Sequence, residues 1–73
     1  MQQQLKDILT HYLDVLDADI SLKSNLKDDL GADSLSLFEV AWAIEREYHC
    51  DIASDEIESW ETVADINNYI NSL

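Results

Sequence analysis

The apolar residues near the start of the chain recur at helical spacing. They follow the series i, i+3, i+4, i+7, i+8 and i+11 as Leu5, Ile8, Leu9, Tyr12, Leu13 and Leu16. This period predicts a helix over residues 2–16 with one buried face. A similar stripe, formed by Val63, Ile66, Ile70 and Leu73, predicts a helix at the end of the chain.

The helical period is lost over residues 17–33, where polar side chains dominate. Four apolar residues interrupt them, and we expect these to hold a long loop against the core: Ile20, Leu22, Leu26 and Leu30. Loops of this length inside a small domain are more often functional than idle. The only glycine, Gly31, stands at the far end of the loop, where a sharp turn is expected.

Two more helices follow the loop. The first is predicted over residues 34–48, with Asp33 or Ser34 as its N-cap. The second is a short helix over residues 54–59, for which Ser54 can serve as the cap.

The last helix is predicted to begin with a capping box, formed by Thr62 and by Asp65 three residues later. Proline, repeats and low-complexity segments are absent, so nothing marks a linker. We therefore expect an all-α fold with a single domain over residues 1–73. Its architecture would be a small antiparallel bundle of three main helices plus one short helix, with the long loop between the first and second helices.

The helix over residues 34–48 carries two apolar stripes. At 100° per residue, one sector about 100° wide suits the core and contains Leu37, Val40, Ala41, Ile44 and Tyr48. A second sector contains Leu35, Phe38 and Trp42, bordered by Glu39, Glu45 and Arg46. Either the short helix covers this second stripe with Ile57 and Trp60, or the stripe is an exposed docking patch for a basic partner.

Acidic residues outnumber basic ones by 16 to 4, and the formal net charge is −12. This charge argues against nucleic acids and anionic membrane surfaces as partners. Residues 28–61 contain eleven acidic side chains and one basic side chain, Arg46. Such crowding lowers stability, so we expect it to serve binding and we expect salt to stabilise the fold.

A single cysteine, Cys50, excludes a disulfide within the chain and fits a reducing compartment. No apolar run approaches the roughly 18 residues of a membrane span, and residues 1–5 lack the features of a signal peptide. We expect a monomeric cytoplasmic protein.

The junction over residues 28–35 does not match the common catalytic or metal-binding motifs. Aligning a calcium loop on Gly31 places leucines at ligand positions, and the glycines of a nucleophile elbow or a phosphate loop are missing. His11 and His49 are the only candidate bases for Ser34, and with Cys50 they show no metal-ligand spacing. We expect no catalysis by this chain and no metal site.

What remains is a serine at a helix N-terminus, beside an acid and an apolar patch. Capping alone could explain Ser34. The position also suits a serine modified by another enzyme, because the amides and the dipole of the first turn favour an attached phosphate.

The stretch Asp29-Leu30-Gly31-Ala32-Asp33-Ser34-Leu35 resembles the signature of the acyl carrier proteins. The resemblance runs without gaps from about Leu5 to Ile70. Residues outside the signature agree with it, among them Leu26, Glu39, Glu45, Tyr48, Ile52, Asp55, Glu56, Thr62, Val63 and Tyr69.

The resemblance implies that Ser34 carries a 4′-phosphopantetheine arm, added from coenzyme A by a magnesium-dependent phosphopantetheinyl transferase. Asp33 and Leu35 would flank the attachment point for the transferase. The thiol of the arm would hold acyl groups as thioesters, and the acyl chain would enter the apolar interior. Synthases with basic patches would dock on residues of the second helix, namely Phe38, Glu39, Trp42, Glu45 and Glu47.

Several positions depart from the common fatty-acid type of this family. Ser36 and Arg46 stand where acids are usual, and Trp42, Trp60 and Ala53 replace other residues. Peptidyl carriers usually read Gly-Gly-His-Ser at the junction, which this chain does not, so fatty acid biosynthesis is preferred. The alternatives are a specialised carrier for a secondary metabolite, lipid modification or D-alanyl transfer, and an unmodified acidic adaptor.

Overall fold

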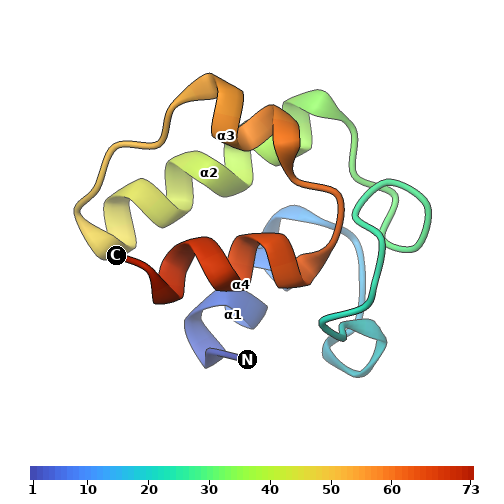
Figure 1. Ribbon diagram of the computed structural model, residues 1–73. Helices are drawn as coiled ribbons and strands as arrows, with labels where there is room; N and C mark the ends of the chain where they lie inside the picture. The colour runs from blue at the N-terminus through green and yellow to red at the C-terminus, as the bar shows by residue number, and fades with distance from the viewer.

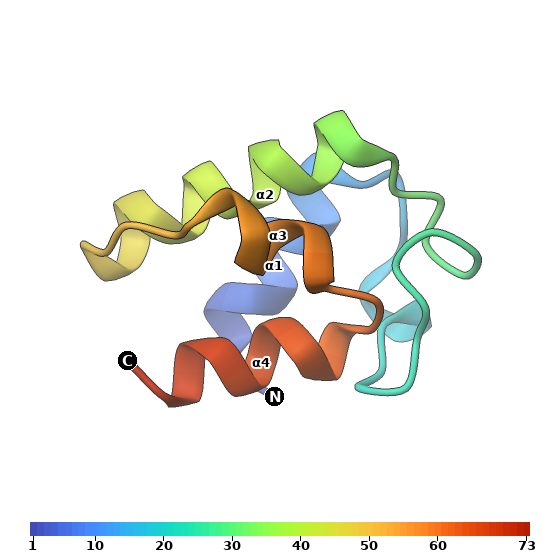
Figure 2. The same ribbon diagram turned by 45° about the horizontal axis from the view of Figure 1, so that its top comes forward.

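The computed structural model describes all residues from 1 to 73 and is entirely helical. Helix α1 spans Gln3–Tyr12, a short 3-10 helix η1 spans Asp17–Asp19, α2 spans Ser34–Tyr48, α3 spans Ser54–Ser59 and α4 spans Val63–Asn71. Figures 1 and 2 show the long loop at one end of the molecule. Helix α1 runs toward this loop, whereas α2 and α4 run away from it. The predicted helical bundle is confirmed.

Helix α1 ends four residues earlier than predicted, because Leu13 adopts an extended backbone with ψ of 138°. Asp14 and Asp17 follow closely, and acidic side chains are unfavourable at the negative end of a helix. Leu13 still packs in the core, but Leu16 is 71% exposed. The assignment of Leu16 to the buried stripe was therefore wrong.

The core contains 17 buried residues drawn from every α-helix and from the loop. The loop contributes Ile20, Leu26 and Leu30, as predicted. Leu22 is 41% exposed and was wrongly placed in the core. Leu22 instead holds the loop through its backbone, since its carbonyl accepts the amide of Ala64 at 2.9 Å.

The caps of the helices differ in how well they were predicted. Asp33 caps α2, and both hydrogen bonds of the predicted capping box are present between Thr62 and Asp65. Ser54 is not a cap, because α3 begins at Ser54 and Ala53 holds the N-cap position without a side-chain hydrogen bond. At the other end of the chain, Leu73 is 58% exposed and lies outside the core stripe predicted for it.

Candidate functional site

The loop delivers Ser34 to the start of α2 through a turn at Gly31. Gly31 has φ of 70°, which confirms the sharp turn predicted for it. On either side of the glycine, Leu30 and Ala32 are buried, and the amide of Ala32 donates to the carbonyl of Leu26 at 2.8 Å. The turn is thus fixed from both sides, and Ser34 follows it as an exposed first residue of the helix.

Asp33 caps α2, so the hydroxyl of Ser34 is not needed for capping. The amide of Ser36 donates to Oδ1 of Asp33 at 2.8 Å, and the amide of Leu37 donates to the Asp33 carbonyl at 3.0 Å. The hydrogen bond from the Ser36 amide lowers the pKa of the Asp33 carboxyl. Ser34 therefore has a free hydroxyl beside a carboxylate that stays ionised at neutral pH.

Neither histidine shares a cavity with Ser34. His49 ends α2 fifteen residues further on, which corresponds to about 22 Å along the helix axis. His11 is exposed on α1 and lies edge to face with Tyr12. Neither histidine is therefore placed to act as a base on the Ser34 hydroxyl.

A small cavity of about 110 Å³ opens beside Ser34, between the loop, α2 and α3. It is lined by Lys27, Ser34, Leu37, Phe38, Ile57 and Glu58. Lys27, Ile57 and Glu58 were not among the expected site residues. One feature of the sequence could have pointed to Lys27 as a site residue, since it is the only basic residue between positions 24 and 45.

Both interpretations of the second stripe of α2 hold in part. Phe38 is half-buried against the core and shares the cavity with Ile57 of α3. Leu35 and Trp42 remain 65% and 55% exposed. Trp60 is buried and contacts Tyr69 of α4, with ring centroids 6.0 Å apart. Helix α3 therefore covers one residue of the stripe and leaves the other two at the surface.

Of the acidic residues expected to meet partners, Glu45 also has a structural role. Its carboxylate accepts the backbone amide of Ile52 at 2.7 Å, which holds the connector after α2. Glu45 and Trp42 line one shallow groove together with Cys50. Burial, with the nearby charges of Glu45 and Asp51, raises the pKa of the Cys50 thiol. Glu39 is half-buried on the same helix.

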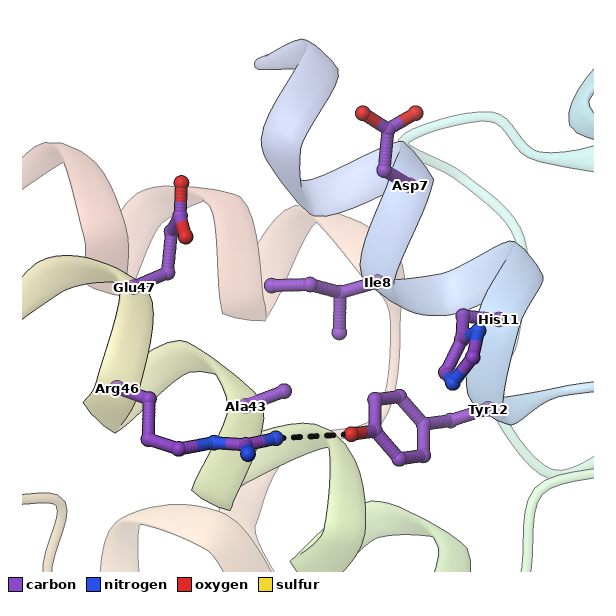
Figure 3. A pocket seen from close by; sticks show the side chains of 7 residues that line it. All are labelled: Asp7, Ile8, His11, Tyr12, Ala43, Arg46 and Glu47. Atoms are coloured by element: carbon purple, nitrogen blue, oxygen red, sulfur yellow. Dashed lines mark hydrogen bonds between the residues drawn. The ribbon is translucent and has the colours of Figure 1, made fainter.

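Glu47 lies apart from the other expected partner residues, in a groove of about 440 Å³ between α1 and α2 (Figure 3). The groove is lined by Asp7, Ile8, His11, Tyr12, Ala43, Arg46 and Glu47. Arg46 crosses it, and its Nη2 donates to the hydroxyl of Tyr12 at 3.0 Å. Ser34 and Phe38 thus line one cavity, and Trp42 and Glu45 line another groove. Glu47 lies in a third groove, on a different side of α2.

No three His, Cys, Asp or Glu side chains are placed to hold a metal ion together. None of the helices combines the length and the apolar character needed to cross a membrane.

The chain matches the model of a known protein family. The model of the family described as "Phosphopantetheine attachment site" matches residues 3–70, which is nearly the whole chain.

Proposed function

Because the chain belongs to the family of phosphopantetheine-attachment domains, which carry 4′-phosphopantetheine covalently, we propose that Ser34 is its attachment point and that the protein is an acyl carrier. The arm supplies a thiol that holds acyl groups as thioesters. The protein supplies position and recognition, and catalysis belongs to its partner enzymes. In this proposal residues 1–73 form one carrier domain.

The observation that carries this proposal is the hydroxyl of Ser34 at the first position of α2, which is exposed and is not used to cap the helix. A transferase can reach this oxygen, because the loop and the Asp33 cap hold it at the surface. The orphan amides and the dipole of the first turn favour the phosphodiester that attachment creates. The residues present therefore fit the group that the family carries.

The recognition surface that we propose surrounds Ser34 on α2. Asp33 and Leu35 flank the serine for the phosphopantetheinyl transferase. Further along the helix lies the docking surface for synthases, made of Phe38, Glu39, Trp42 and Glu45. Exposed Leu35 and Trp42 supply apolar contact, and the acids attract basic patches. Glu47 would serve a partner that also reaches the groove along α1.

We assign the carrier to fatty acid biosynthesis, with specialised carriers as the alternative pathway. Of the six residues that line the cavity, three are apolar, namely Leu37, Phe38 and Ile57, and this side of the lining is compatible with an alkyl chain as cargo. The single thiol, Cys50, is compatible with a reducing cytoplasm, which we retain as the compartment.

The mass of the protein tests the attachment site. The chain is incubated with coenzyme A, magnesium and a broad-specificity phosphopantetheinyl transferase. Wild type and Ser36→Ala should gain the mass of one arm, and Ser34→Ala should gain none. Since Asp33 caps α2, Ser34→Ala should change the free energy of unfolding by no more than about 0.5 kcal/mol. An unmodified wild type would favour the adaptor instead, and a modified Ser34→Ala would refute the site.

Loading assays separate the two pathways. The modified protein is offered to an acyl ligase with fatty acids and to amino-acid ligases. Loading with fatty acids supports the assignment, and loading by an amino-acid ligase alone would remove it.

A further inference from the structure

Lys27 brings a positive charge to the cavity beside Ser34. The two residues line the same space of about 110 Å³, and Glu58 is the only other charged residue there. Two other basic side chains, Lys6 and Arg46, make their contacts away from this cavity. Lys6 pairs with Asp17 at 3.6 Å, and Arg46 donates to Tyr12.

The backbone at Lys27 and at the residue before it is held in place by hydrogen bonds. Its amide donates to Oδ1 of Asn25 at 3.0 Å. The preceding Leu26 is fully buried, and its amide donates to the carbonyl of Glu61 at 2.8 Å. The carbonyl of Leu26 in turn accepts the amide of Ala32, two residues before Ser34. The flexible stem of Lys27 therefore starts from a point that is tied to the start of α2.

A phosphodiester on Ser34 would enter strongly acidic surroundings. Asp28 and Asp29 are exposed on the loop, and Asp33 keeps its carboxylate ionised because the Ser36 amide lowers its pKa. An added negative charge is repelled by these groups. Lys27 is the one group of the cavity wall that offsets this repulsion.

We propose that the ammonium of Lys27 pairs with the phosphodiester of the arm on Ser34 and holds the root of the arm over the cavity. This inference rests on the attachment proposed above. Lys27 is a positioning residue, since it acts on the bound group and takes no part in thioester chemistry. A lysine suits this role because its ammonium binds phosphate as a compact point charge. The pair is exposed and therefore weak, and its loss should lower the ratio of docked to free arm by a factor of about two to five.

The test uses the ³¹P resonance of the loaded protein, which reports the mobility of the phosphodiester directly. Wild type, Lys27→Gln, Lys27→Arg and Lys23→Gln are loaded, and loading is verified by mass. Lys27→Gln should slow ³¹P transverse relaxation toward that of a free arm, and Lys27→Arg should restore the wild-type rate. Lys23→Gln is the matched control, because it removes an exposed loop lysine that does not line the cavity.

Two further measurements keep the test decisive if a variant loads poorly. In the loaded wild type, about 0.5 M NaCl should reproduce the effect of Lys27→Gln, because salt screens an exposed pair. Glu58→Gln should have the opposite effect, since it removes the competing anion of the cavity wall. Equal relaxation in wild type and Lys27→Gln, equal effects of Lys27→Gln and Lys23→Gln, or no response to salt would each overturn the role of Lys27. Failure of the wild type to gain mass would instead overturn the attachment itself.

Discussion

Gly31 and Asp33 act as a pair of local devices that present Ser34. The first reverses the chain with a left-handed backbone, and the second ends the turn by capping α2. Side-chain volume is not what restricts the position of Gly31. A Cβ added at Gly31 would meet no atom within 4 Å, so the glycine is required by its φ of 70° alone. The turn is therefore sensitive to backbone preference and not to side-chain volume.

Substitution of Gly31 tests this at the scale of one residue. Gly31→Ala should destabilise the protein by about 1–2 kcal/mol, the usual cost of placing an L-residue in the left-handed region. Gly31→Asn should cost less, because asparagine visits that region more readily. Urea denaturation of the three proteins measures the difference. A larger loss for asparagine than for alanine would show that space, and not backbone conformation, limits the position.

Hydrogen bonds from backbone amides to carboxylates define where α2 and α4 begin. At α4, Oδ2 of Asp65 accepts the amides of Thr62 and Glu61 at 3.0 and 2.8 Å. These bonds lower the pKa of the Asp65 carboxyl. The same segment pairs with the loop, because the amide of Leu26 donates to Glu61. The start of α4 therefore supports both the helix and the loop that carries the site.

Asp65→Asn should reveal the contribution of this carboxylate through its pH dependence. The folded pKa lies below the unfolded value of about 3.9, so the charge stabilises the protein at neutral pH. This contribution is lost as the pH falls through the folded pKa. Melting temperatures of wild type and variant should thus differ above about pH 5 and converge toward about pH 2.

Asp14→Asn is the control, since this exposed carboxylate has no hydrogen bond to an amide. Because Asp14 follows the negative end of α1, its replacement should raise the melting temperature slightly above about pH 5 and should not lower it. A constant difference between wild type and Asp65→Asn across the whole range would contradict the role of the charge.

The molecule as a whole carries its negative charge with little internal compensation. Its net charge is −12, and the one ion pair, between Lys6 and Asp17, lies outside residues 28–61, where the acids are concentrated. Compact size adds to the repulsion, because the radius of gyration is only 10.8 Å. A basic partner would relieve this repulsion on binding, which connects the charge to the proposed docking surface.

Salt should therefore stabilise the unbound protein. Raising NaCl from about 0.02 to about 0.5 M should increase the melting temperature by about 4–8 °C, which corresponds to about 1 kcal/mol in a domain of this size. Scanning calorimetry measures the shift. MgCl₂ at equal ionic strength should act alike if screening is the cause. A melting temperature that does not respond to salt would show that the repulsion is unimportant.

Features that arise between residues close together in the chain could be predicted before the fold was known. Helical periods, the capping box and the turn at Gly31 depend on partners within about four positions, so they could be predicted. The attachment at Ser34 was likewise suggested by neighbouring residues, although that assignment stays a prediction.

Contacts between side chains of distant segments became visible only in the folded protein. Burial depends on what packs against a residue, so the helical period misplaced Leu16, and apolar character alone misplaced Leu22. The pattern of the sequence could not show that Lys27 of the loop and Ile57 of α3 form one cavity with Ser34. Those contacts join positions up to 30 residues apart, and no local pattern encodes their distance.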